Sequence, residues 1–152
     1  MKFLKIFIPM VLLALTLYYC STIPITGRSQ LNLISSSDLN ALSFQQYSEF
    51  LKQNKLSADA QNTNMVKGVG LKIQKAVENY FAQHNLSNEL NGYTWEFNLI
   101  ESPEVNAWCM PGGKVVVYTG ILPITENETG LAVVMGHEIS HAVAQHGAER
   151  MS

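Results

Sequence analysis

The stretch LAVVMGHEISHAVA, residues 131–144, combines an apolar helical pattern with three ionisable side chains. Most of its positions are apolar or small, so we expect a helix that is buried along most of its length. His137 and His141 are four residues apart, which places both imidazoles on one face of that helix. Glu138 lies about 100° from His137 around the axis, at the edge of the same face. Ionisable groups buried in this way need a compensating partner.

The His-Glu-x-x-His spacing is typical of a metallopeptidase zinc site. In this interpretation His137 and His141 bind one Zn²⁺ ion, which lowers the pKa of a water to about 7 and polarises the scissile carbonyl. Glu138 accepts the proton of that water as a general base. The structural alternative is that the histidines form hydrogen bonds within the core and Glu138 pairs with a cation. The apolar context of the motif favours the zinc interpretation.

A catalytic zinc site has three protein ligands, so the motif leaves one ligand to be found. His146 follows His141 by five residues and lies about 140° away around a helix, so it is expected to face elsewhere. Glu149 lies about 12 Å further along the axis if the helix continues. Gly147 is a residue type that often ends a helix, which weakens the exclusion of Glu149.

Residues 1–19 are predicted to be an export signal. Lys2 and Lys5 form a basic start, and the apolar run at 6–19 is shorter than the roughly 20 residues of a membrane span. Cys20 follows directly, as in a bacterial lipoprotein signal, where this cysteine is the site of lipid attachment. Tyr19 stands where a small residue is usual, so the alternative is an uncleaved leader that anchors the chain. Both interpretations place the rest of the chain outside the cytoplasm, at a membrane.

The composition favours one globular domain, residues 38–152, after a linker at 20–37. Only 14% of the 152 residues are charged and the net charge is -2. No Lys/Arg cluster stands out, so nucleic-acid binding is not expected. Cys20 and Cys109 occur in such different contexts that a disulfide between them is not expected either. No feature of the sequence indicates an oligomeric state.

The remaining patterns predict helices and strands in an α+β fold. Asp38 is expected to cap a first helix, and Thr125 with Glu128 forms a capping box for the last one. Gly68 and Gly70 weaken the second helix and suggest close packing there. The turn at 111–113, between two of the expected strands, suggests a hairpin or meander. The expected elements are helices at 39–55 and 63–84, strands at 93–100, 107–110 and 114–120, and a final helix from about Thr125.

Three segments together resemble the membrane-linked zinc metallopeptidases of metallopeptidase family forty-eight. The segments are PITGRSQLNLIS at 24–35, NAWCMPGGKVVVYTGIL at 106–122 and ENETGLAVVMGHEISHAVAQHGAERMS at 126–152. The family includes the CAAX prenyl protease, HtpX and the OMA-type proteases, and the resemblance is to its bacterial lipoprotein branch. It implies a zincin-like fold, with helices packed on a small β-sheet and the active helix beside the sheet edge. It also implies that His137 and His141 are the zinc ligands and Glu138 the catalytic base.

The resemblance implies further that the third zinc ligand is a glutamate on a later helix, beyond Ser152. This chain therefore resembles the N-terminal part of a catalytic domain, and we expect exposed apolar surface on its active helix. The implied function is a zinc-dependent metalloendopeptidase that cleaves proteins or peptides. The expected location is the bacterial cell envelope, as an outer-membrane lipoprotein that faces the periplasm and acts in protein quality control. One alternative is a catalytically incomplete lipoprotein that binds peptides or a partner protein. Another is an anchored structural domain without a metal.

Overall fold

The computed structural model describes residues 20–22, 27, 29–31 and 35–145. The predicted export signal, His146 and Glu149 lie outside these residues. Cys20 lies at the start of strand β1 (Cys20–Thr22), which pairs antiparallel with β2 (Ser29–Leu31). The segment expected to be a linker therefore includes a short two-stranded sheet, and lipid attachment at Cys20 stays a prediction. Within the described residues, no helix has both the length and the apolar character needed to cross a membrane.

Helix α2 (Ser36–Gln53) begins earlier than expected, because Ser35 rather than Asp38 is its N-cap. The Ser35 hydroxyl accepts a hydrogen bond from the backbone N–H of Asp38 at 3.1 Å. In return it donates to the Asp38 carboxylate at 2.6 Å. The predicted cap at Asp38 is therefore wrong by three residues. Asp38 lies in the first turn instead, where its charge is favourable at the positive end of the helix dipole.

Helix α3 (Ala60–Gln83) also begins before its expected start, since the Asp59 side chain accepts from the backbone N–H of Asn62. The sequence suggests close packing at Gly68 and Gly70, and the structure shows it at Gly70 only. A Cβ atom at Gly70 would overlap the ring of Phe97, whereas one at Gly68 would meet nothing within 4 Å. The short 3-10 helix η1 (Ser87–Leu90) follows. A loop then leads from η1 into the sheet.

The main sheet contains β3 (Glu96–Ile100), β4 (Ala107–Met110) and β5 (Lys114–Tyr118) in the order β3-β5-β4. Strands β4 and β5 form the expected hairpin. Its turn includes Gly112 and Gly113, both with φ above +80°, a conformation that glycine adopts without strain. The meander is wrong, since β3 pairs in parallel with β5 rather than with β4. All five residues of β5 are buried, as suits a central strand covered on both faces.

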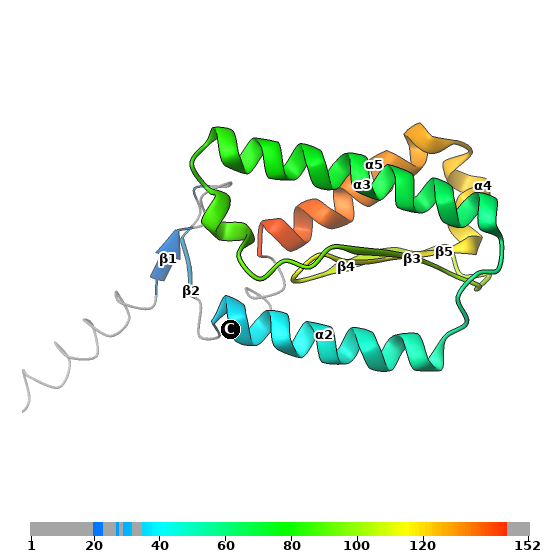
Figure 1. Ribbon diagram of the computed structural model, residues 1–152, viewed down its shortest axis with the longest axis horizontal. Coiled ribbons are helices and arrows are strands. Elements are labelled where there is room, and N and C mark those ends of the chain that lie inside the picture. Colours follow the sequence, from blue (N-terminus) through cyan, green and yellow to red (C-terminus); the bar gives the residue numbers. More distant parts are fainter. Residues whose placement is uncertain (1–19, 23–26, 28, 32–34, 146–152) are drawn as a thin grey trace, which may run out of the picture.

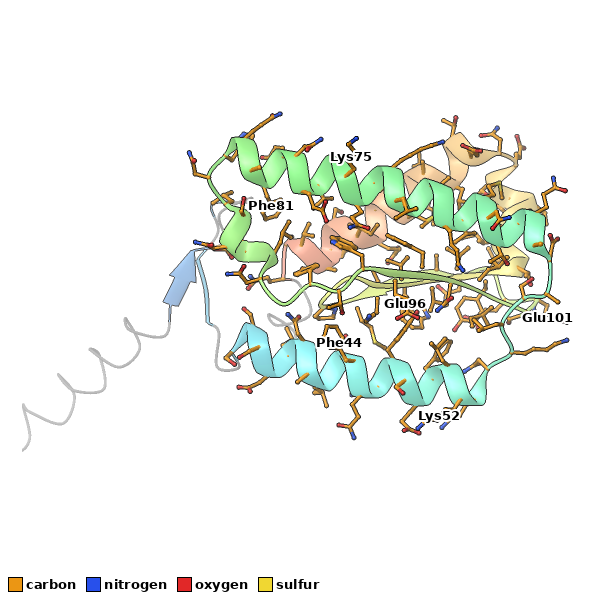
Figure 2. All side chains as sticks on the ribbon, viewed as in Figure 1. Phe44, Lys52, Lys75, Phe81, Glu96 and Glu101 are labelled. Atoms are coloured by element: carbon orange, nitrogen blue, oxygen red, sulfur yellow. The ribbon has the colours of Figure 1, made fainter. Side chains whose placement is uncertain are left out.

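Helices cover both faces of this sheet and give the expected α+β fold (Figure 1). Helix α2 packs on one face, where Tyr47, Phe50 and Leu51 meet side chains of all three strands. Figure 2 shows Phe44 of this helix pointing toward the sheet and Lys52 pointing away from it. Helices α3 and α5 pack on the other face. The buried residues of this larger core are Val66, Val69, Phe97, Leu99, Ala107, Val115, Val117, Ile121, Leu131, Met135 and Ile139.

The last helix expected from the sequence is divided into α4 (Leu122–Thr125) and α5 (Glu128–Val143). The predicted capping box is wrong, because Thr125 ends α4 and its hydroxyl donates to the Leu122 carbonyl at 3.0 Å. Asn127 is the N-cap of α5, and its side-chain oxygen accepts from the backbone N–H groups of Thr129 and Gly130. Gly130 fits against the Thr125 carbonyl, where a Cβ atom would clash. The absence of a side chain at Gly130 therefore lets the start of α5 pack closely against the end of α4.

Candidate active site

Helix α5 presents both motif histidines on one face, as the sequence predicts. The Nε2 atoms of His137 and His141 are 3.1 Å apart. Their ring centroids are 4.5 Å apart, with the ring planes at 86° to each other. The helix is buried along most of its length, as expected, but on one face. Leu131, Met135, Ile139 and Ala142 are buried, whereas Val133 is 69% exposed.

The separation of the two imidazoles fits a zinc ion. Two nitrogen ligands of a tetrahedral zinc, each at about 2.0–2.1 Å from the metal, lie about 3.3 Å from each other. The Nε2 distance in α5 is 3.1 Å, so both atoms can occupy corners of the same tetrahedron with little adjustment. Across residues 35–145, no group of three or more His, Cys, Asp and Glu residues is arranged to hold a metal ion. The described part of the chain therefore offers a pair of ligands, on one turn of one helix.

Glu138 is half-buried, and the helix that carries it packs against strand β4. Burial, and secondly the negative charge of Glu138, raise the pKa of the Cys109 thiol to about 12. The carboxylate is thus close enough to the middle of β4 for its charge to act there. Cys109 itself packs at the edge of the larger core. Cys109 thus packs as a small, largely buried apolar residue.

Among the described residues, strand β4 forms an open edge of the sheet next to the motif helix. Its only partner strand in the described part of the chain is β5. The opposite edge, at β3, is partly covered. The backbone N–H of Ser57 donates to the Leu99 carbonyl at 2.9 Å, and the backbone N–H of Glu101 donates to the Lys55 carbonyl at 2.8 Å. Along β4, Ala107 and Cys109 belong to the core on the α5 side. The backbone groups of the outer β4 edge therefore lie close to the face that carries Glu138.

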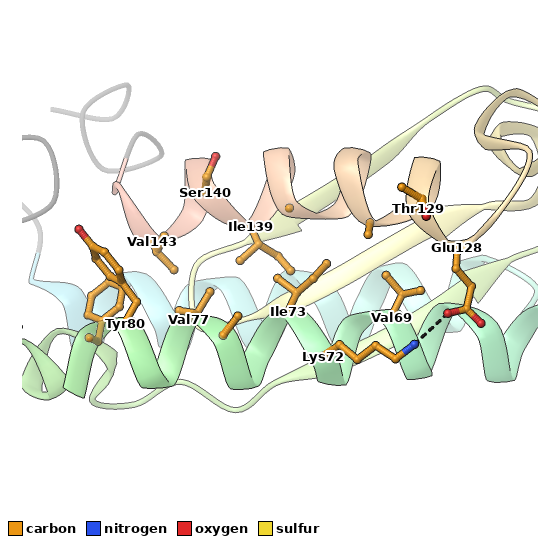
Figure 3. A pocket seen from close by; sticks show the side chains of 14 residues that line it. Val69, Lys72, Ile73, Val77, Tyr80, Glu128, Thr129, Ile139, Ser140 and Val143 are labelled. Atoms are coloured by element: carbon orange, nitrogen blue, oxygen red, sulfur yellow. Dashed lines mark hydrogen bonds and ion pairs between the residues drawn. The ribbon is translucent and has the colours of Figure 1, made fainter. Parts of the chain in front are cut away.

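An apolar groove of about 660 Å³ runs between α3 and α5 (Figure 3). Ile73 and Val77 of α3 face Ile139 and Val143 of α5 across it. The ion pair between Lys72 and Glu128, 2.8 Å long, crosses one end. Ile139 is about 200° around the helix from His137, so the groove lies on the other side of α5 from the imidazoles. It provides the exposed apolar surface expected on this helix and is separate from the candidate metal site.

Tyr93 contributes to the site in a way that the sequence patterns did not indicate. They suggest that it opens a strand, but it precedes β3 and reaches α5 instead. Its hydroxyl donates to the Ala142 carbonyl, next to His141, at 3.3 Å. Burial raises the pKa of this hydroxyl well above its ordinary value. No local sequence signal connects these two residues, which are 49 positions apart.

Comparison with known proteins agrees with this geometry. A model of peptidase family M48 matches residues 70–152, more than half of the chain. The chain belongs to peptidase family M48. The match includes strands β3–β5 and the whole of α5, so the candidate site lies within the part that defines M48 membership.

Individual M48 relatives include metalloendopeptidases of mitochondria and a bacterial protease. The mitochondrial metalloendopeptidase OMA1 of Bos taurus is 31% identical over 85% of this chain. OMA1 of Arabidopsis thaliana is 43% identical over 51% of the chain. The β-barrel assembly-enhancing protease of Escherichia coli is 42% identical over 38% of it. The matches cover 24%, 16% and 12% of these relatives respectively, so the chain spans less than a quarter of their length.

Proposed function

We propose that this chain carries the helix-borne part of a zinc metalloendopeptidase active site, with His137 and His141 as zinc ligands and Glu138 as the general base. The observation that supports the proposal most is the 3.1 Å separation of the two Nε2 atoms. It comes close to the separation of two ligands on one tetrahedral zinc. Membership of M48 supports the same assignment. The third ligand is expected in sequence beyond Ser152.

In this proposal each side chain has a separate task. Bound zinc supplies a Lewis acid that polarises the scissile carbonyl and lowers the pKa of a water. His137 and His141 hold the ion through Nε2, and α5 fixes their spacing. Glu138 lies one residue after His137, on the β4 side, where it accepts the proton of the attacking water and passes it to the leaving amine. Because Glu138 is half-buried, its charge is screened less than that of a surface carboxylate.

The substrate class that suits this site is an extended peptide or a protein segment without stable structure. Such a segment adds to the open edge of β4 through main-chain hydrogen bonds. Those bonds place the peptide backbone beside α5, within reach of Glu138. This is the zincin-like arrangement, in which an edge strand and the active helix enclose the scissile bond. The partly covered edge at β3 is the poorer candidate.

The proposed setting is the bacterial cell envelope, with membrane attachment through residues 1–19 or a lipid on Cys20. An outer-membrane lipoprotein that faces the periplasm fits these features. The similarity to the Escherichia coli β-barrel assembly-enhancing protease supports a role in envelope protein quality control. The second candidate is a catalytically incomplete protein that binds peptides without cleaving them. It is favoured by one observation: residues 35–145 hold the histidine pair without a group of three ligands.

Replacement of Glu138 by Gln tests the chemistry. We expect the zinc-loaded protein, with its third ligand present, to cleave an unfolded protein such as casein, and Glu138→Gln to lower the rate by at least about a hundredfold. Zinc content, measured by metal analysis, should not change. Glu128→Gln is the matched control, because Glu128 is exposed at the start of the same helix and pairs with Lys72. Cleavage that survives Glu138→Gln would refute the base assignment. Peptide binding without cleavage by the wild type would support the second candidate.

A further inference from the structure

His141 lies in the last turn of α5, the least constrained part of a helix. The helix ends at Val143, only two residues later. The final carbonyl groups of a helix lack intrahelical partners, and terminal turns fray more readily than interior ones. His137 lies a full turn further inside. The spacing of the two imidazoles therefore depends on how firmly the last turn is held.

Small side chains and a few backbone bonds anchor this turn from within. Ala142 and Ala144 are buried, but each offers little apolar area compared with Leu131 or Met135 earlier in the helix. The backbone N–H of Ala144 donates to the Ser140 carbonyl at 2.9 Å, and that of Gln145 donates to the Ala142 carbonyl at 3.1 Å. These two backbone bonds are local to α5 and do not tie the turn to the sheet.

Tyr93 supplies that connection. Its hydroxyl donates to the Ala142 carbonyl at 3.3 Å, and its ring packs against Trp95 with centroids 5.2 Å apart. The surrounding backbone is fixed: the N–H of Tyr93 donates to the Leu90 carbonyl, and the N–H of Thr94 donates to the Gly112 carbonyl. Tyr93 is therefore held by the sheet and the β4–β5 turn, independently of α5. A hydrogen bond from such a fixed donor restrains the turn from outside.

We propose that Tyr93 is a positioning residue, which ties the last turn of α5 to the sheet and so sets the distance between the His141 and His137 imidazoles. It contacts neither the substrate nor the metal. The effect of Tyr93 on zinc affinity rests on the proposed function of the chain as a zinc peptidase. The structural part of the proposal, the restraint on His141, applies to the metal-free chain as well.

Replacement of Tyr93 by Phe removes the hydroxyl and keeps the ring. We expect the amides of Ala144 and Gln145 to exchange with deuterium about fivefold faster, the effect of losing one net hydrogen bond. The nuclear Overhauser effect between the His137 and His141 rings should weaken in the metal-free protein. Zinc affinity, measured by calorimetry, should fall by about fivefold. The exchange of core amides such as Val116 should change much less.

Tyr118→Phe is the matched control. Tyr118 is buried, and its hydroxyl accepts from the Trp108 indole at 3.3 Å, on the sheet face that α2 covers. We expect this variant to leave the His137–His141 ring contact, the Ala144 and Gln145 exchange and the zinc affinity unchanged. Faster exchange in Tyr93→Phe with an intact ring contact would show a purely structural role and overturn the proposal. If the wild type binds no zinc, the proposed function fails. The role of Tyr93 is then tested by the His137–His141 ring contact in the metal-free chain, which does not depend on zinc.

Discussion

Gly68 and Gly70 of α3 are two residues apart and have opposite surroundings. A Cβ atom at Gly68 would meet nothing within 4 Å, whereas one at Gly70 would overlap the Phe97 ring. Glycine in a helix costs about 0.5–1 kcal/mol relative to alanine, so Gly68→Ala should raise the free energy of unfolding by that amount. Gly70→Ala should lower it by about 1–3 kcal/mol through overpacking. Urea unfolding followed by circular dichroism measures both, and equal effects would contradict the packing at Phe97.

Cys109 provides a test of where Glu138 lies. Burial and the Glu138 charge raise the pKa of this thiol to about 12, so the folded chain holds the thiol proton more tightly than the unfolded chain does. This contribution to stability is complete below the ordinary thiol pKa and is lost as the pH rises toward 12. At pH 8.5 we expect iodoacetamide to modify Cys109 at least about a hundredfold more slowly in the folded chain than in urea. Peptide mass spectrometry separates Cys109 from Cys20.

Glu138→Gln is the informative variant in the same assay. It removes a negative charge, which lowers the pKa of Cys109 and should speed its modification in the folded chain. Glu128→Gln, at the far end of α5, should have no effect. An unchanged rate in Glu138→Gln would show that the carboxylate does not face β4.

For contacts between individual residues, the sequence predicts those within one helix and misses those between distant segments. The His137–His141 pair follows from helical geometry alone, since four residues make slightly more than one turn. The bond from Tyr93 to Ala142 depends on how the loop before β3 meets the end of α5. The hydrophobic periodicity of the sequence does not predict this contact. A buried tyrosine does need a partner for its hydroxyl, which is the only general signal available.

Among the helices, α5 depends on its cap at Asn127. The side-chain oxygen accepts from two backbone N–H groups, at 2.9 and 3.1 Å. We expect Asn127→Ala to lower the free energy of unfolding by about 1 kcal/mol. Glu128→Gln should change it by less than about 0.5 kcal/mol, because both partners of the Lys72–Glu128 pair are more than half exposed. Thermal unfolding of both variants checks this. An equal loss in the two would show that charge rather than capping holds the start of α5.

Element types and the β4–β5 hairpin were predictable here, but the helix caps and the pairing of β3 were not. Two candidate caps lie close together at both helix starts, Ser35 near Asp38 and Thr125 near Asn127. Local preference does not separate them. At α5 the choice follows from the close contact between Gly130 and the Thr125 carbonyl. The parallel pairing of β3 with β5 likewise depends on β5 being buried on both faces, which is a property of the assembled layers.

At the scale of the whole molecule, Lys114 adds a polar link between the sheet and the α2 layer. This lysine of β5 donates to the Thr94 carbonyl at 2.7 Å and to the Glu96 carboxylate at 3.2 Å. Its ammonium group also lies 4.9 Å from the centre of the Phe44 ring and 5.7 Å from that of Tyr47, both on α2. Its side chain is only 11% exposed. The sheet and the α2 layer therefore share one buried charge.

Lys114→Met keeps the length of the side chain and removes these polar contacts. We expect the free energy of unfolding to fall by about 2–4 kcal/mol, since the Thr94 carbonyl and the Glu96 carboxylate each lose a donor. Lys52→Met is the control, because Lys52 is 66% exposed and pairs with Glu49 on its own helix. It should change stability by less than about 0.5 kcal/mol. Guanidinium unfolding compares the two, and similar losses would contradict a bridging role for Lys114.

The strand order β3-β5-β4 has a consequence for how the chain forms during synthesis. The central strand is the last of the three to be made, since residues 114–118 follow both outer strands. A nascent chain that has reached Met110 has two strands and no pairing between them, because each bonds only to β5 in the finished sheet. Helices α2 and α3 have no sheet to pack on until then. The layers therefore assemble in one late step, after β5 has left the ribosome, rather than progressively from the N-terminus.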